Sequence, residues 1–268
     1  MATRHPVIKL SWKDKRAFVS LMANAFSPDP LFNKLFIRNQ TALTATYRVK
    51  AFLSFMFDMS MLGGSNVCGI FDGDRLIACY LLEVPVKNLF LRILGIILTL
   101  IRAMALPYQI SVRSVKVLND YMRITRATVP PGRHYYLVMI GVHETARGQG
   151  FGKTLMQEII SRVERDEQAI GISLDTENSS NVGLYEHFGF VLQKEICLDG
   201  LAVYCMFRKQ VDGFGVEQDS IGIEASVQPG VREGRAKSGA PLNFALGFQT
   251  RRIVTCCLFQ NSGPATPP

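Results

Sequence analysis

The stretch YYLVMIGVHETARGQGFGKTLMQEIISRVERD, from Tyr135 to Asp166, decides the fold of this chain. Its first eight residues, Tyr135 to Val142, are dominated by apolar and aromatic side chains and have the length of a buried strand. After a polar bend, apolar residues recur with the spacing of one helical face, at Phe151, Leu155, Met156, Ile159, Ile160 and Val163. The pattern predicts a strand, then a turn that contains Gly148, Gly150 and Gly152, then a helix.

The glycine-rich turn is suited to binding an anion. The first backbone N–H groups of a helix have no partner inside the helix, and the helix dipole places partial positive charge there. Glycines let a phosphate approach these groups, and Arg147 and Lys153 add positive charge. A Walker A loop would need glycine in place of Arg147, and a dinucleotide fingerprint would need glycine in place of Lys153. The turn therefore predicts a phosphate-bearing ligand of another kind.

Two motifs give the chain a family resemblance. Arg147-x-x-Gly150-x-Gly152 resembles the acetyl-CoA loop of the GNAT superfamily of N-acetyltransferases, (Arg/Gln)-x-x-Gly-x-(Gly/Ala). Further along, LDTENSSNVGLYEHFGF is similar to the family's Asn-x-x-x-Tyr-x-x-x-Gly-Phe segment, with matches at Asn181, Tyr185, Gly189 and Phe190. Two motifs in the family's order are far more specific than one. The local sequence, including PPGRHYYL at 130–137, resembles the small-amine- and drug-modifying branch that contains puromycin acetyltransferase.

The resemblance implies an α/β GNAT fold, in which helices flank a mixed, mostly antiparallel central sheet and a helical insert precedes the cofactor strand. It implies an enzyme that transfers acetyl directly from acetyl-CoA to an amine, here of a small molecule, without a metal. Backbone groups of the central strand would bind the pantetheine arm and polarise the thioester carbonyl, while the loop would hold the pyrophosphate. The cofactor-binding residues expected on this basis are Ile140, Gly141, Val142, Arg147, Gly148, Gln149, Gly150, Phe151, Gly152, Lys153 and Asn181.

Tyr185 is the residue to which the resemblance gives a catalytic role, as donor of a proton to the departing CoA sulfur. Taken alone, it would more often be a core aromatic residue. The general base stays open, because the position that holds a glutamate in the histone-modifying branch holds Tyr136 here. Candidates are an ordered water or Glu83, His134, His143 and Glu144, of which the last two are better suited to shaping the turn. The alternative function is a non-catalytic, acyl-CoA-binding regulatory module with the same fold.

The charge distribution bears on partners. The formal charge of +8 lies within residues 1–210, because residues 211–268 carry five acidic and five basic side chains. This excess suits a cofactor with several phosphate groups, although a generally basic surface explains it equally well. The sequence has no stripe of Lys and Arg with interleaved aromatic residues, so nucleic acid is not an expected partner. The oligomeric state is left open.

The cysteines favour a reducing compartment. Six occur, at positions 68, 79, 197, 205, 256 and 257, without a C-x-x-C pair or a zinc-binding spacing. Asp199-Gly200 predicts a two-residue hairpin turn, which would place Cys197 opposite Ala202 and Cys205 opposite Lys194, so these cysteines should not form a disulfide. The segment MATRHPVIKL has no apolar core of signal-peptide length, and a cytoplasmic location is expected.

The other elements follow from periodicity and turn residues. Strands are expected at 6–12, 66–71, 76–83, 170–174, 190–198 and 201–208, and helices at 13–26, 42–61, 112–126 and 181–187. The prolines of SPDP, at 27–30, should end the first helix. Residues 1–210 would form the GNAT N-acetyltransferase domain. Residues 211–268, rich in glycine, proline and serine, would form a poorly ordered C-terminal extension.

The most apolar segment is LFLRILGIILTLIRAMAL, from Leu89 to Leu106. Its uninterrupted core, Ile93 to Ile101, is bounded by Arg92 and Arg102 and is nine residues long. Spanning a bilayer takes about 20 apolar residues, so stable membrane insertion is not expected. A buried helix, a helix that lines an apolar acceptor pocket and an amphipathic surface anchor all remain open.

Overall fold

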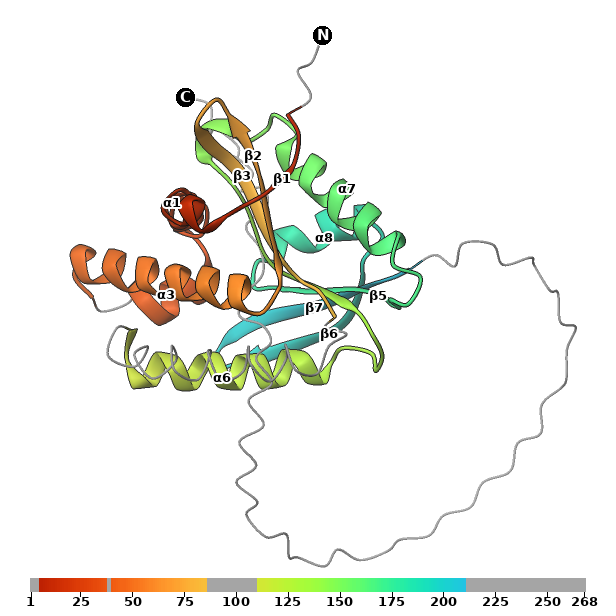
Figure 1. Cartoon of the computed structure of the whole chain (residues 1–268). Helices are drawn as coiled ribbons and strands as arrows, with labels where there is room; N and C mark the ends of the chain where they lie inside the picture. Colours follow the sequence, from red (N-terminus) through yellow and green to blue (C-terminus); the bar gives the residue numbers. More distant parts are fainter. Residues whose placement is uncertain (1–4, 38–39, 86–109, 211–268) are drawn as a thin grey trace, which may run out of the picture. The chain divides into compact units, whose positions relative to one another are not determined.

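The computed structural model describes residues 5–37, 40–85 and 110–210 (Figure 1). The segment from Leu89 to Leu106 and the extension at 211–268 lie outside these described residues, and so do the expectations for them. Within the described ranges, seven strands form one sheet: β1 (Ile8–Lys9), β2 (Asn66–Asp72), β3 (Arg75–Glu83), β4 (Tyr135–Val142), β5 (Gly171–Thr176), β6 (Val191–Leu198) and β7 (Leu201–Lys209).

The strand order across the sheet is β1-β2-β3-β4-β5-β7-β6. β4 and β5 run parallel, whereas the other neighbouring pairs are antiparallel. The helices are α1 (Lys15–Ala25), α3 (Ala42–Leu62), α6 (Val112–Ala127), α7 (Phe151–Glu164) and α8 (Ser180–His187), with the shorter turns η1 (Trp12–Asp14), α2 (Pro30–Phe32), η2 (Asn33–Ile37) and η3 (Glu144–Ala146). The predicted α/β architecture, a mostly antiparallel sheet flanked by helices, is confirmed.

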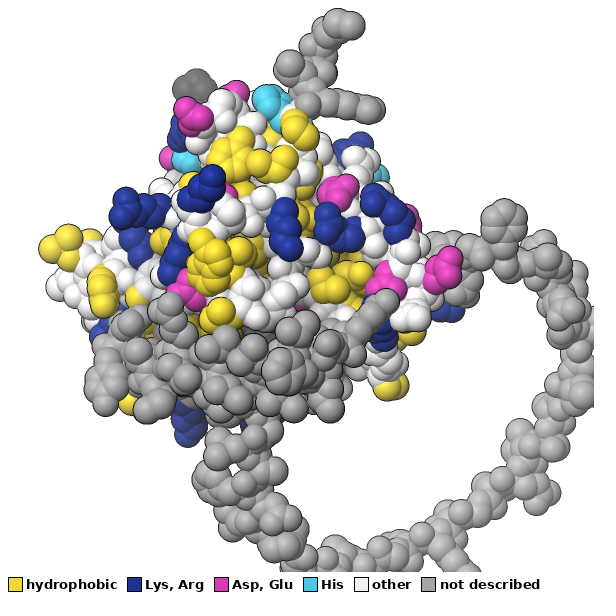
Figure 2. Space-filling view, viewed as in Figure 1, with side chains coloured by type: hydrophobic (Ala, Val, Ile, Leu, Met, Phe, Trp, Pro, Cys, Tyr) yellow, Lys and Arg dark blue, Asp and Glu magenta, His cyan; other side chains and the backbone are white. Residues whose placement is uncertain are grey.

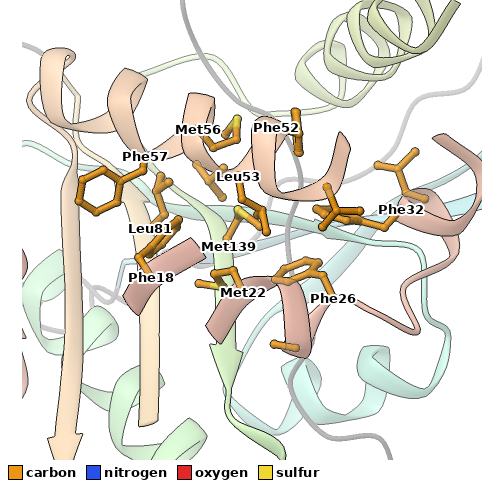
Figure 3. Packing of buried hydrophobic residues seen from close by; sticks show 14 of the residues in the cluster. Phe18, Met22, Phe26, Phe32, Phe52, Leu53, Met56, Phe57, Leu81 and Met139 are labelled. Carbon is orange, nitrogen blue, oxygen red and sulfur yellow. The ribbon is translucent and has the colours of Figure 1, made fainter. Parts of the chain in front are cut away.

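Two hydrophobic clusters hold helices to the two faces of the sheet. One cluster joins α1, α3 and α6 to what we call the α3 face, and Figure 3 shows Phe18 and Phe57 meeting Leu81 and Met139 there. The other joins α7 and α8 to the opposite face, which we call the α7 face. Successive residues of a strand point to opposite faces, so β3 and β4 contribute side chains to both clusters.

The N-terminal region differs in detail from the expectation. A strand was expected over residues 6–12, but only Ile8–Lys9 pair with β2. Ser11 and Asp14 explain the difference, because the Asp14 carboxylate accepts from the backbone N–H and the hydroxyl of Ser11, both at 2.7 Å. This capping arrangement starts a helical turn at Trp12. Asp29 likewise begins the short α2, with its side chain accepting from the N–H of Phe32 at 2.9 Å.

The hairpin between β6 and β7 has the predicted register. Asp199 and Gly200 both have positive φ, 53° and 77°, as a tight two-residue turn requires. Cys197 lies opposite Ala202 and Cys205 opposite Lys194, and both cysteines are free. The prediction that they form no disulfide is confirmed.

A polar contact fixes the start of β4 against the end of α7. Asp166 accepts a hydrogen bond from Arg133 at 2.7 Å and another from the Tyr135 hydroxyl at 3.0 Å. Burial alone would raise the pKa of Asp166, but these two donors outweigh it and lower the pKa. The contact therefore depends on an ionised carboxylate.

Candidate active site

The site lies where β4 separates from β5. The two strands pair only where they begin, at Tyr135–Ile172 and Tyr136–Ser173. Val138 is an extra residue of β4 relative to β3, and such a bulge bends a strand. From Val138 to Val142, β4 has β3 on one side and no ladder partner on the other among the described residues. We call this stretch the unpaired β4 edge.

The glycine loop follows directly after this edge. Gly148 and Gly150 have φ of 77° and 84°, a left-handed conformation that glycine adopts without strain. Within the described part of the chain, the N–H groups of residues 148–153 donate no hydrogen bond, and the first bond of α7 runs from the Thr154 N–H to the Gly150 carbonyl at 3.0 Å. The N-terminus of a 14-residue helix thus presents a run of N–H groups that can bind an anion.

The side chains of the loop leave this surface accessible. A Cβ placed on Gly148 or Gly150 would meet no atom within 4 Å, so the space in front of both is open. Gln149 and Lys153 are exposed, and the Gln149 amide folds back to donate to the Thr145 carbonyl at 3.0 Å. Gly152, in contrast, is buried in the first turn of α7. Arg147 is half-buried at the entrance to the loop.

Gly141 allows a helix to approach the middle of the sheet. A Cβ at Gly141 would lie 2.9 Å from the Met22 sulfur and 3.0 Å from the Ala25 Cβ, both of α1. Its neighbours Ile140 and Val142 point the other way, into the cluster on the α7 face. The predicted cofactor strand is therefore buried on both faces, and its unpaired edge is what remains available for binding.

Tyr185 lies in that same cluster on the α7 face. Its side chain is 0% exposed, its ring packs edge-on against Phe190 at 5.8 Å, and its hydroxyl has no hydrogen-bond partner among the described residues. A buried hydroxyl without a partner costs free energy, and this one is free to donate to a bound molecule. Asn181, one turn earlier on α8, is also buried and donates to the Thr176 hydroxyl at 3.3 Å.

The candidates for a general base have other roles or positions. His143 caps η3 by accepting from the Thr145 N–H, and Arg75 lies 2.9 Å from its ring. Burial and then Arg75 lower the pKa of His143, and its ring has a structural role at the start of η3. Glu144 is exposed, and its N–H donates to Asn24 at 3.3 Å. The remaining candidates are Glu83 at the end of β3 and His134, whose ring lies 2.9 Å from the Gly132 carbonyl.

The sequence did not single out a buried acidic cluster on the α3 face. The Tyr121 hydroxyl of α6 donates to the carboxylates of Asp175 and Glu177, at the end of β5. Burial and then the charges of Asp29 and Asp175 raise the pKa of Glu177 well above its usual range. The pKa of Tyr121 is also raised, by burial and by the same two carboxylates. We call Asp29, Tyr121, Asp175 and Glu177 the Tyr121 cluster.

Comparison with known proteins bears on the fold. The chain has the GNAT fold, and residues 112–190 match the family described as the acetyltransferase (GNAT) family. A crystal structure of histone acetyltransferase HPA2 and related acetyltransferase, from Corynebacterium glutamicum, superposes with a TM-score of 0.57 at 17% identity, covering 77% of this chain and 97% of that one. The match shows the same fold.

Two curated relatives match parts of the sequence. An uncharacterized N-acetyltransferase of Schizosaccharomyces pombe is 35% identical over 85 residues, 31% of this chain and 32% of the relative. N-alpha-acetyltransferase 30 of Saccharomyces cerevisiae is 34% identical over 62 residues, 23% of this chain and 35% of the relative. The chain thus spans about a third of the length of these relatives.

Two features are absent from the described residues. No helix among them is both long enough and apolar enough to cross a membrane. In the same ranges, no three His, Cys, Asp or Glu side chains are arranged to hold a metal ion. Figure 2 shows Lys and Arg side chains interspersed with Asp and Glu on the visible face.

Proposed function

We propose that this chain is an acetyl-CoA-dependent N-acetyltransferase that transfers acetyl directly to an amine, with residues 1–210 as its catalytic domain. The observation that carries the proposal is the buried, unpartnered hydroxyl of Tyr185, which shares a hydrophobic cluster with Ile140 and Val142 of the unpaired β4 edge. A general acid placed there has no structural partner and would cost stability unless a ligand uses it.

The residues present fit acetyl-CoA. The N–H groups of residues 148–153 would hold the pyrophosphate, with Arg147 and Lys153 adding charge. The unpaired edge at Ile140, Gly141 and Val142 would bind the pantetheine arm by backbone hydrogen bonds, as an added strand does. Gln149, Phe151 and Asn181 would complete the binding site.

The proposed reaction requires few protein side chains. Acetyl-CoA, when bound, supplies an acetyl thioester. Backbone N–H groups of the β4 edge would stabilise negative charge on the carbonyl oxygen, and the Tyr185 hydroxyl would give its proton to the leaving sulfur. A neutral amine would form the new C–N bond as the C–S bond breaks, and the proton that its nitrogen then loses would pass to solvent water, from which Tyr185 would regain a proton.

A small-molecule amine is the proposed acceptor, on the resemblance of the local sequence to the drug-modifying branch. The relative named N-alpha-acetyltransferase 30 favours a second class of acceptor, an α-amine. The two classes of acceptor can be distinguished by experiment, because the same thiol assay can be run with either kind of amine.

The test is release of free CoA thiol from acetyl-CoA with aminonucleosides, polyamines, lysine peptides and peptides with a free α-amine. Amine-dependent release is expected, and Tyr185→Phe should lower it by about 10²- to 10⁴-fold, the usual worth of general acid catalysis. Tyr135→Phe, which also removes a buried hydroxyl but at the far end of β4, should retain the activity. Tight acetyl-CoA binding without release for any amine would favour the non-catalytic module.

A further inference from the structure

Arg208 of β7 contacts both helices that cover the α7 face. Its Nε donates to the Phe188 carbonyl at 3.1 Å, where α8 ends, and its Nη2 donates to the Glu164 carboxylate at 2.7 Å, where α7 ends. Arg208 itself pairs with Ile172 of β5, so the side chain extends from a fixed strand. One guanidinium therefore joins the C-terminal ends of α7 and α8 to the sheet.

The contact at Phe188 lies within one turn of the Tyr185 side chain. The Tyr185 carbonyl accepts from the N–H of Phe188 at 2.9 Å and from the N–H of Phe190 at 3.0 Å. The Phe190 ring also packs edge-on against the Tyr185 ring. An isolated helix as short as α8, with eight residues, is not stable in water, so its position depends on such tertiary contacts. Arg208 thus fixes the turn that holds both the backbone and the ring of Tyr185.

Gly189 leaves room for the contact between Arg208 and Phe188. Gly189 has a φ of 81°, and a Cβ at this position would lie 3.4 Å from the Arg208 Nε. A side chain there would be strained by its own backbone and would crowd the guanidinium. The glycine that follows Tyr185 in the second family motif is therefore matched to an arginine on another strand.

Stability alone does not account for an arginine in this place. The Arg208 side chain is 14% exposed, and its Nη1 has no hydrogen-bond partner among the described residues. Burying a guanidinium with an unmatched N–H costs free energy, and an apolar side chain would avoid that cost. The planar guanidinium can, however, hold two acceptors in a fixed geometry. The arrangement therefore favours a role in placing the ends of the two helices.

We propose that Arg208 is a positioning residue, which holds the Tyr185 hydroxyl where it can give its proton to the leaving sulfur. This rests on the proposed function and adds to it a residue outside both family motifs. Because Arg208 also ties α8 to α7, Tyr185 and the proposed phosphate site at the start of α7 have a fixed spacing. The spacing matters, since a misplacement of about 1 Å at the reacting atoms can cost about 10²-fold in rate.

The kinetics of the full chain test this role. Arg208→Met removes both contacts and should lower kcat in the thiol assay by about 10- to 100-fold, with KM for acetyl-CoA little changed. If Arg208 acts through the Tyr185 hydroxyl, the same change made in Tyr185→Phe should alter kcat by no more than about twofold. The matched control is Arg162→Met, which removes an arginine that pairs with Glu158 within α7 and should retain kcat. An equal loss of kcat with and without the Tyr185 hydroxyl, or no loss, overturns the proposal.

Hydrogen exchange separates this inference from the proposed function, because it needs no turnover. In Arg208→Met, the N–H groups of Phe188 and Phe190 should exchange about tenfold faster or more, the worth of one hydrogen bond from a charged group. The N–H of Ile159, in the middle of α7, should exchange as in the wild type. Faster exchange without transfer to any amine would support the hold of Arg208 on α8 and refute the transferase.

Unchanged exchange with normal transfer would refute the positioning role and leave the transferase standing. A second variant covers the case in which Arg208→Met does not fold. Arg208→Lys keeps a charge for Glu164 but has no Nε to donate to the Phe188 carbonyl. It should fold and give the same pattern in both assays, and wild-type kcat together with wild-type exchange would overturn the proposal.

Discussion

Two buried tyrosines allow a direct test of the claim that Tyr185 is reserved for a ligand. Tyr185 and Tyr121 are 0% and 1% exposed, but the Tyr121 hydroxyl donates to two carboxylates whereas the Tyr185 hydroxyl has no partner among the described residues. Removing an unsatisfied buried hydroxyl relieves a desolvation cost of about 1–3 kcal/mol, and removing one that donates to a charged carboxylate such as Asp175 forfeits about 1.5–3 kcal/mol. Phenylalanine in the two positions should therefore have opposite effects on stability.

The measurement is thermal unfolding of the full chain without ligand. For a domain of this size, 1 kcal/mol shifts the midpoint by about 2–4 °C. Tyr185→Phe should raise the midpoint by about 2–12 °C while it lowers the transfer rate, and Tyr121→Phe should lower the midpoint by about 3–12 °C. A midpoint that falls for Tyr185→Phe as far as for Tyr121→Phe would mean that the Tyr185 hydroxyl has a structural partner, and the reasoning would fail.

Three further changes probe the loop, the cofactor strand and the start of β4. Gly150→Glu should abolish acetyl-CoA binding in calorimetry, because a side chain and a negative charge would enter the proposed phosphate site; unchanged affinity would refute the assignment. Gly141→Val should destabilise the fold by about 1–3 kcal/mol in urea unfolding, since its Cβ would collide with α1. Asp166 has a lowered pKa, so its contacts with Arg133 and Tyr135 stabilise the fold above the unfolded value of about 3.9 and are lost as the pH falls through the folded value. The stability difference between wild type and Asp166→Asn should thus be present at pH 7 and shrink at low pH, and a constant difference would argue against the ionised contact.

The elements that were predicted correctly carry their signal locally. The strand from Tyr135 to Val142 and helix α7 are encoded by hydrophobic periodicity within single segments, and the hairpin at Asp199-Gly200 by two adjacent turn residues. Tyr185 stood out because its motif is contiguous. The length of β1 was overestimated because the Asp14 carboxylate accepts a hydrogen bond from the Ser11 N–H. Strand propensity does not account for such bonds between a side chain and the backbone.

The Tyr121 cluster escaped prediction because its members come from distant segments. Tyr121 is separated by 54 residues from Asp175 and by 56 from Glu177, and only the packing of α6 on the sheet joins them. A local signal was nevertheless present. Asp175 directly follows the apolar run of β5, in a strand that is buried throughout, and a charged residue in such a strand is seldom there without a partner or a function.

The position of Cys205 bears on whether the acetyl group passes through the protein. Cys205 lies opposite Asp175 in the sheet and lines a small cavity with Thr125 and Ser173, and a thiolate there would be a nucleophile able to accept an acetyl group. Burial, and then the charge of Asp175, raise the pKa of its thiol to about 12. At neutral pH about one molecule in 10⁵ would hold the reactive thiolate. A covalent acetyl-enzyme at Cys205 is therefore disfavoured, and we expect direct transfer, with both substrates bound at the same time. Initial-rate plots at several fixed amine concentrations should intersect, and Cys205→Ser should retain transfer; parallel lines would show instead that the acetyl group is first handed to the enzyme.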